Sequence, residues 1–163
     1  MKPTRLLTGS SSPVFRAFLD TVETVAGSDV TVLLSGEIGS GKTVVARLLH
    51  DKSDRIAGPI VEVPIAAMSP SLVESELFGH VKGAFSGATT DRKGLIEEAD
   101  GGLLFIDEIG HLSPENQRRL LLFLQDRHIR RVGASHSTRQ AVDVKVVVAT
   151  HLNLREEVDA GRF

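Results

Sequence analysis

Residues 30–43 read VTVLLSGEIGSGKT, and this stretch decides the fold. It begins with a short apolar, β-branched run at 30–35, which is typical of a buried strand. A glycine-rich segment follows, and residues 42–51 then repeat apolar side chains at helical spacing. A strand, a turn and a helix in this order, with the pattern G-x-x-x-x-G-K-[ST], indicate a loop that binds phosphate groups.

The residue types of this loop suit an anion. Its glycines let consecutive backbone N–H groups turn inward around a phosphate, at the N-terminus of a helix whose dipole favours negative charge. Lys42 would reach the β- and γ-phosphates, and the Thr43 hydroxyl would bind Mg²⁺. The predicted nucleotide-binding residues of the loop are Gly36, Glu37, Ile38, Gly39, Ser40, Gly41, Lys42, Thr43 and Val44.

A second signal is the stretch LLFIDEI at 103–109, an apolar strand that ends in two carboxylates. Side chains alternate along a strand, so Asp107 and Glu108 should face different ways and have different tasks. Asp107 suits a Mg²⁺ ligand, and Glu108 suits a base that orients the attacking water. Alone, such a pair is more often a solvated strand end, but the phosphate loop in the same chain favours the catalytic interpretation for Lys42, Asp107 and Glu108.

Another apolar strand, at 145–150, ends in the polar residues Thr150 and His151. They would lie at the sheet edge near the γ-phosphate and could sense its loss, or they could simply cap the strand. Two of the six histidines lie in segments with a candidate function: His151 at this strand end, and His80 in the glycine-rich segment 76–88. The other four are interpreted as polar surface or helix-end residues: His50, His111, His128 and His136.

Strands and helices alternate along the chain, which predicts an α/β fold with a largely parallel sheet of about four strands. Helices are expected at 12–26, 42–51, 69–78, 93–100, 113–127 and 155–160. Strands are expected at 30–35, 60–64, 103–107 and 145–150, with short extended pieces at 129–132 and 142–144.

Composition excludes several classes of protein. The 163 residues fit one domain, and 41% hydrophobic with 25% charged residues are ordinary for a globular protein. The net charge of −2 gives no overall attraction to nucleic acid or anionic membrane, and the short clusters Arg118-Arg119 and Arg130-Arg131 resemble solvated faces. We therefore expect no sequence-specific DNA binding. No cysteine, membrane-spanning run or secretion signal is present, so cytoplasm is the expected location.

Residues 76–88, ELFGHVKGAFSGA, form a glycine-rich loop around one aromatic residue, Phe85. The loop is too flexible to pack a core and too apolar for a plain linker. It is typical of a tip that presents a hydrophobic side chain to a partner.

Taken together, these segments resemble the AAA+ ATPase domains of sigma-54-dependent bacterial transcription activators. The likeness covers nearly the whole chain and includes GSSSPVF, TVLLSGEIGSGKT, EEADGGLLFIDEI, RRVG and VDVKVVVATHLNL. GAFSGA is similar to the signature loop of this family, usually GAFTGA, with Ser86 in place of threonine. The resemblance implies a three-layer αβα P-loop core with Walker A at 36–43, Walker B at 99–108 and sensor I at Thr150-His151.

The resemblance also implies a function. In this family, ATP hydrolysis with Mg²⁺ in a homo-oligomeric ring, commonly a hexamer, moves the signature loop. The loop contacts sigma-54 in the closed polymerase–promoter complex and drives it to the open complex. The residues that would make this contact are Gly83, Ala84, Phe85, Ser86, Gly87 and Ala88.

Two departures from the family pattern affect these expectations. Pro64-Ile65-Ala66-Ala67 stands where the family has Asn-Cys-Ala-Ala, and proline cannot donate a hydrogen bond to Glu108 as that asparagine would. The sequence ends at Phe163, before the family's arginine fingers, its last strand and its helical lid, and Arg162 is not at a finger position. We therefore expect one domain, 1–163, incomplete at its C-terminus, with an exposed strand at 30–35 and weak ATPase activity alone.

Two other functions remain open. A degenerate regulator would bind ATP or ADP without hydrolysing it, and Pro64 favours this alternative. A different AAA+ machine, such as a helicase loader or a chelatase subunit, would explain the phosphate loop but leaves GAFSGA unexplained.

Overall fold

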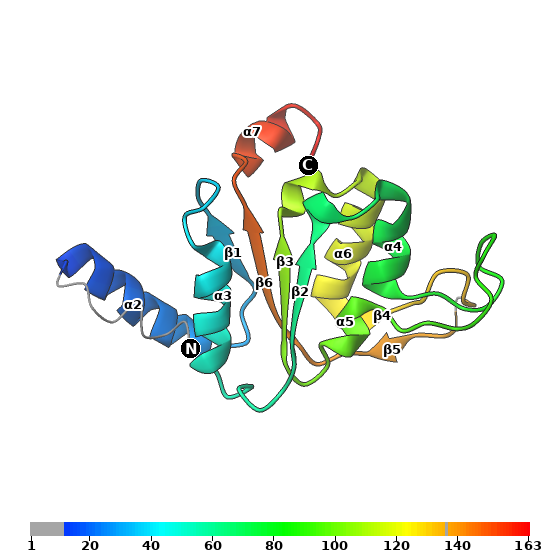
Figure 1. Ribbon diagram of the computed structural model, residues 1–163, viewed down its shortest axis with the longest axis horizontal. Helices are drawn as coiled ribbons and strands as arrows, with labels where there is room; N and C mark the ends of the chain where they lie inside the picture. Colours follow the sequence, from blue (N-terminus) through cyan, green and yellow to red (C-terminus); the bar gives the residue numbers. More distant parts are fainter. Residues whose placement is uncertain (1–11, 136) are drawn as a thin grey trace.

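Figure 1 shows the computed structural model of the chain, which describes residues 12–135 and 137–163. Segment 1–11 and His136, predicted above to be a polar surface or helix-end residue, lie outside the described residues. The helices are α2 (Pro13–Ala26), α3 (Lys42–Asp51), α4 (Pro70–Phe78), α5 (Leu95–Glu98), α6 (Pro114–Asp126) and α7 (Leu154–Asp159). The strands are β1 (Val32–Ser35), β2 (Ile60–Pro64), β3 (Leu103–Asp107), β4 (His128–Ile129), β5 (Gln140–Ala141) and β6 (Lys145–Thr150). Two short 3₁₀ turns are η1 (Ile65–Ala67) and η2 (Ile109–His111).

The main sheet is parallel, with the strand order β1-β6-β3-β2. In its register Ser35 lies opposite Thr150, and Pro64 lies opposite Asp107. Because all four strands run the same way, their carboxyl ends meet at one edge of the sheet. The predicted α/β class with a parallel sheet of about four strands is confirmed.

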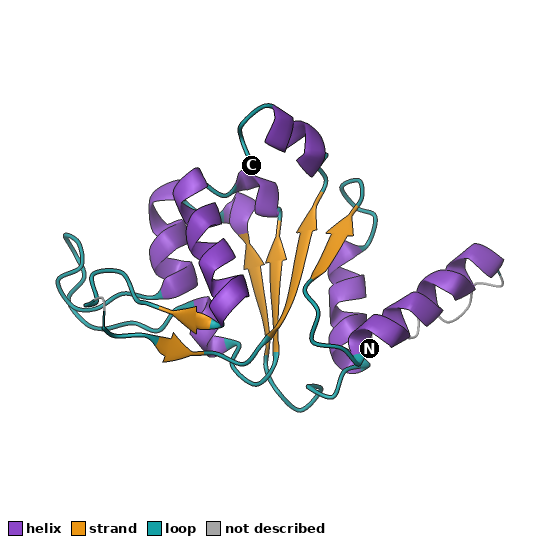
Figure 2. Cartoon of the chain, turned by 180° about the vertical axis from the view of Figure 1, so that it is seen from behind, coloured by secondary structure: helices purple, strands orange, loops and turns teal. Residues whose placement is uncertain are grey.

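Helices cover both faces of this sheet, which gives the predicted three layers (Figures 1 and 2). The alternation of β3 explains how: Leu103 and Phe105 join one core cluster with α2 and α3, while Leu104 and Ile106 join the other with α4, α5 and α6. These four side chains are at most 1% exposed. Burying each stabilises the fold by about 1.5–3 kcal/mol.

Strand β1 differs from the prediction made from its composition. It was expected as a buried strand over 30–35, but it begins at Val32 and alternates between half-buried and exposed residues. Leu33 is 50% exposed, and within residues 12–135 and 137–163 β1 pairs with β6 alone. The strand is therefore the open edge that the family resemblance implied.

The second pair of strands is also displaced from the prediction. The extended pieces expected at 129–132 and 142–144 are β4 (His128–Ile129) and β5 (Gln140–Ala141), which pair antiparallel. Val142 and Val144 are buried, but their apolar side chains enter the core without forming a ladder there. In this segment the apolar, β-branched residues indicate buried side chains rather than a paired strand.

A buried ion pair fixes the region beside this small hairpin. The Glu97 side chain on α5 is 3% exposed and takes hydrogen bonds of 2.8 and 2.9 Å from Arg131 Nη2. Burial raises the pKa of Glu97, but hydrogen bonds from Arg131 and Gln140 outweigh burial and leave the pKa below its usual value. The pair therefore links α5 to the segment that follows β4.

None of the helices in the described ranges is both long and apolar enough to cross a membrane.

We predict that Glu97→Gln lowers the free energy of unfolding by about 2 kcal/mol at neutral pH. Because the folded pKa of Glu97 is depressed, its stabilisation is fully present above about pH 4.3 and is lost as the pH falls through the folded pKa. The difference between wild type and variant in urea unfolding should therefore shrink in acid. The control is Glu98→Gln, a neighbouring exposed glutamate, and equal losses at neutral and acid pH would contradict the prediction.

Candidate functional site

The glycine-rich loop lies between β1 and α3, as the motif requires. Gly41, the N-cap of α3, has φ +91°, and Gly39 has φ +81°. No atom lies within 4 Å of a Cβ built on either residue, so backbone conformation rather than lack of space requires glycine. Gly36 N donates to Thr150 O at 3.2 Å, which ties the start of the loop to the end of β6.

Lys42, the first residue of α3, folds back over this loop. Its Nζ donates to Gly36 O at 2.8 Å and to Glu37 O at 3.1 Å, and lies 3.9 Å from Glu108 Oε1. The Lys42 side chain is 10% exposed. The structure thus brings two of the three predicted catalytic residues together, although 66 positions separate them in the sequence.

Asp107 is the last residue of β3, and one of its carboxylate oxygens accepts no hydrogen bond from the described residues. Its Oδ1 is buried and has no hydrogen-bond partner within the described residues. A buried carboxylate oxygen is stabilised by a cation, and Mg²⁺ prefers oxygen ligands. Residues 12–135 and 137–163 hold no cluster of three or more histidine, aspartate or glutamate side chains suited to a metal. Asp107, with Thr43 in the first turn of α3, fits an ion held largely by phosphate oxygens and water.

Glu108 follows β3 and does not continue it. Its backbone is left-handed, with φ 61° and ψ 50°, which is uncommon for a residue with a side chain. Burial raises the pKa of Glu108, but hydrogen bonds from the His151 side chain and backbone, with the charges of His151 and Lys42, lower it by more. The net pKa is below the usual range, which keeps Glu108 in the ionised form that a base requires.

The two polar residues at the end of β6 have different surroundings. Thr150 is fully buried, and its Oγ1 accepts a hydrogen bond of 3.0 Å from Leu152 N, so it caps the chain after the strand. His151 instead approaches Glu108: its Nδ1 lies 2.6 Å from Glu108 Oε2. The His111 ring lies beside that of His151, with centroids 5.8 Å apart.

The loop that contains GAFSGA joins α4 to α5 and projects from the side of the molecule opposite α2 (Figure 1). Its base is fixed by backbone hydrogen bonds, in which His80 pairs with Arg92, and Val81 N donates to Val132 O at 3.0 Å. Near the tip, Gly83 N donates to Ala88 O at 2.8 Å. The loop is therefore a structured projection with a hydrogen-bonded base.

Phe85 at this tip is half-covered. It is 41% exposed, and its ring meets the His80 ring edge to face, with centroids 4.9 Å apart and planes at 65°. His80 Nδ1 is buried and has no hydrogen-bond partner in the described part of the chain. His80 thus packs against one part of the Phe85 ring and leaves the rest of the ring exposed.

Sequence reasoning did not predict several contacts that the structure shows among these residues. It set His80 and His151 apart from the other histidines, yet nothing in the sequence paired them with Phe85 and Glu108. The pairing of His151 with Glu108 depends on β6 lying beside β3, which a single sequence does not specify. The return of Lys42 to the carbonyl groups of its own loop also left no signal in the sequence.

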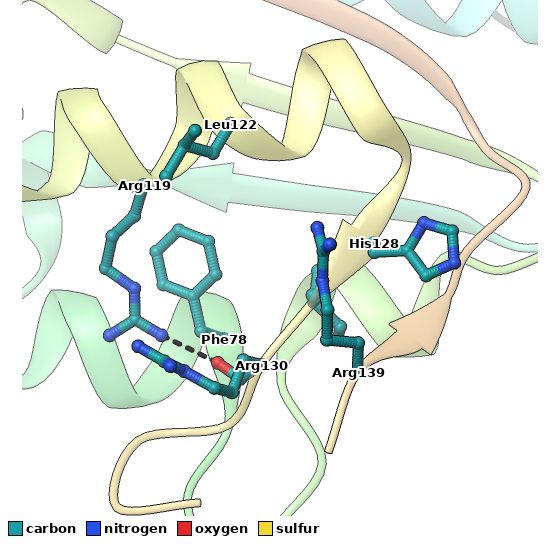
Figure 3. A pocket seen from close by; sticks show the side chains of 7 residues that line it. Phe78, Arg119, Leu122, His128, Arg130 and Arg139 are labelled. Atoms are coloured by element: carbon teal, nitrogen blue, oxygen red, sulfur yellow. Dashed lines mark hydrogen bonds between the residues drawn. The ribbon is translucent and has the colours of Figure 1, made fainter. Parts of the chain in front are cut away.

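One arginine of each basic cluster, Arg119 and Arg130, lines a pocket of about 310 Å³ between α6 and β4 (Figure 3). Arg119 lies over the Phe78 ring at 4.3 Å, pairs with Glu74 and donates to Arg130 O at 2.7 Å. Arg139 pairs with Asp126. Intramolecular partners therefore engage much of the positive charge of this pocket.

Comparison with known proteins agrees with this geometry. The transcriptional regulatory protein ZraR of Klebsiella oxytoca is 53% identical over 152 residues, which are 93% of this chain and 34% of ZraR. The anaerobic nitric oxide reductase transcription regulator NorR of Citrobacter koseri is also 53% identical, over 93% of this chain and 30% of NorR. The chain thus spans about a third of the length of these relatives.

Solved structures give the same picture. NtrX from Brucella abortus in complex with ADP is 34% identical, with a TM-score of 0.85 over 94% of this chain and 33% of NtrX. The P-loop NTPase domain of a sigma-54 transport activator from E. coli has a TM-score of 0.62 over 94% of this chain and 86% of that domain, and its 18% identity shows the fold alone. The family described as the sigma-54 interaction domain matches residues 8–163, and the chain belongs to that family.

Proposed function

We propose that this chain is the ATP-binding and ATP-hydrolysing core of a sigma-54-dependent transcription activator. The observation that carries the proposal is the convergence of Lys42 and Glu108, 3.9 Å apart, beside a glycine-rich loop at the carboxyl edge of a parallel sheet. Ligands of open parallel sheets bind at this edge. The ADP and ATP complexes of NtrX support the choice of nucleotide.

In this proposal the loop at 36–43 cradles the phosphates through backbone N–H groups. Lys42 leaves the carbonyl groups of Gly36 and Glu37 and binds the β- and γ-phosphates instead. Both contacts are single hydrogen bonds to neutral oxygens, and a charged phosphate is a stronger acceptor.

Asp107 and Thr43 would hold Mg²⁺, which supplies positive charge to the phosphates. The unpartnered Oδ1 of Asp107 supports this assignment, because a buried charge without a partner is costly. Glu108 would orient the water that attacks the γ-phosphate, and its depressed pKa supports the ionised state.

Segment 83–88 would contact sigma-54, with Phe85 and Ser86 at the tip. The 41% exposure of the Phe85 ring, on a loop held at its base, supports a partner contact. An aromatic anchor contributes large apolar area at small entropic cost.

We place this activity in a homo-oligomeric ring, with a neighbouring subunit completing each site. Arg162 is not at the family's finger position, and its guanidinium group donates to Glu157 of the same chain at 2.6 and 2.9 Å.

A degenerate, nucleotide-binding module is the second candidate, and the position of Pro64 favours it. Pro64 lies opposite Asp107 on the neighbouring strand and offers no side-chain donor to the adjacent Glu108. Measuring ATPase activity of the full-length protein with and without Pro64→Asn separates the two candidates. Robust wild-type turnover excludes the degenerate module, and turnover that appears only with asparagine supports it.

We predict that Glu108→Gln lowers kcat for Mg²⁺-dependent ATP hydrolysis by about 100-fold or more, since the amide cannot act as a base. ATP affinity should change little, because the phosphate loop is unaltered. The comparison variant is Lys42→Ala, which should weaken nucleotide binding itself. Hydrolysis by Glu108→Gln within a few-fold of wild type would remove Glu108 from the proposed role.

We predict that Phe85→Ala in the full-length protein abolishes open-complex formation while ATP hydrolysis continues, because the loop lies apart from the phosphate site. The matched control is Phe18→Ala, since Phe18 on α2 is 39% exposed, close to the 41% of Phe85. Open-complex formation should be measured on a sigma-54 promoter with both variants. Undiminished open-complex formation by Phe85→Ala, or an equal loss in both variants, would contradict the proposed role of this loop.

A further inference from the structure

The two oxygens of the Glu108 carboxylate have unequal partners. Oε2 accepts a 2.6 Å hydrogen bond from His151 Nδ1 and a 3.3 Å bond from His151 N. Among the described residues, the other oxygen, Oε1, has only Lys42 Nζ nearby, at 3.9 Å and beyond hydrogen-bond distance. Residue 151 therefore sets the orientation of this carboxylate.

The other neighbouring strand cannot perform this task. β3 lies between β6 and β2, and the β2 residue beside the end of β3 is Pro64. Proline has neither a backbone N–H nor a polar side chain. The hydrogen bonds that Glu108 accepts come instead from the β6 side, where His151 follows the last residue of the strand.

We propose that His151 is the positioning residue of Glu108, and that its Nδ1–H supplies the donor that Pro64 does not supply on the opposite side. The proposal rests on the proposed role of Glu108 as the base. It gives His151 a task distinct from a direct contact with the γ-phosphate, and it explains how a chain with proline at position 64 keeps its base oriented.

The chemistry of the ring makes the proposal specific. An ionised carboxylate only accepts hydrogen bonds, so Nδ1 carries the proton whether the ring is neutral or charged. An asparagine amide can place a donor close to the position of Nδ1, whereas a glutamine amide reaches toward the position of Nε2. His151→Asn should therefore replace the contact, while His151→Gln and His151→Ala should not.

The first experiment measures steady-state ATP hydrolysis by the full-length protein. We expect His151→Ala and His151→Gln to lower kcat by about 10- to 100-fold, the range for a lost hydrogen bond to a charged group, with KM nearly constant. His151→Asn should stay within about threefold of wild type. Equal losses in the asparagine and alanine variants, or no loss in alanine, would overturn the proposal.

Two controls separate positioning from other roles. His111→Ala should change kcat by less than about twofold, because His111 Nδ1 lies 4.0 Å from Glu108 Oε2, too far for a hydrogen bond. In a Glu108→Gln background, His151→Ala should cost nothing further if His151 acts only through Glu108. A further loss of tenfold or more would mean that His151 contacts the substrate directly and would overturn the proposal.

A second measurement does not depend on ATP turnover. It therefore tests the role of His151 even if the wild type does not hydrolyse ATP and the proposed function fails. Crystal structures of the nucleotide-free full-length protein should show the Glu108 carboxylate within hydrogen-bond distance of the side chain of residue 151 in wild type and His151→Asn. In His151→Ala and His151→Gln the carboxylate should turn away. An unchanged Glu108 in the alanine variant would overturn the proposal.

Discussion

Parallel pairing of β3 between β6 and β2 is the constraint on which the rest of this structure depends. Because every strand of the main sheet runs the same way, the ends of β1, β2, β3 and β6 reach one edge together. The glycine-rich loop, the carboxylates of Asp107 and Glu108, Pro64 and the Thr150-His151 pair are distant in sequence but meet there. One reversed strand would remove its residues from the site, whatever their chemistry.

This constraint explains why sequence patterns located the elements well and the contacts poorly. The bounds predicted for α3, β2, β3 and β6 agree with the structure residue for residue. Glycine or proline precedes α3, β2 and β3, and polar residues end the apolar runs of β3 and β6. Strand β1 was predicted too long and too buried, since an apolar run reports hydrophobicity and not the number of neighbouring strands. For the same reason, the extended piece was predicted at 142–144 whereas β5 lies at Gln140–Ala141, because Val142 and Val144 are buried without pairing.

In the site, residue types were predictable and partners were not. The phosphate-loop motif identified Lys42 because its spacing is local to one turn and one helix. The contact between Glu108 and His151 crosses 43 positions and needs the strand order β6-β3, together with the left-handed backbone of Glu108. No local pattern specifies either of these, so tertiary structure alone reveals which group the carboxylate meets.

The position of the GAFSGA loop limits how the phosphate site can act on it. Its base is hydrogen-bonded to Arg92 and Val132, and the adjacent Arg131 is paired with the buried Glu97 of α5. Helices α4 and α5 share their core cluster with Ile106 of β3, the strand that ends at Asp107. Cores are densely packed and deform little, so under the proposed function a signal from the phosphate site would reach Phe85 by moving α4, α5 and the β4–β5 hairpin as a unit. Motion of the whole loop relative to α4 and α5 would instead break the hydrogen bonds of the loop base.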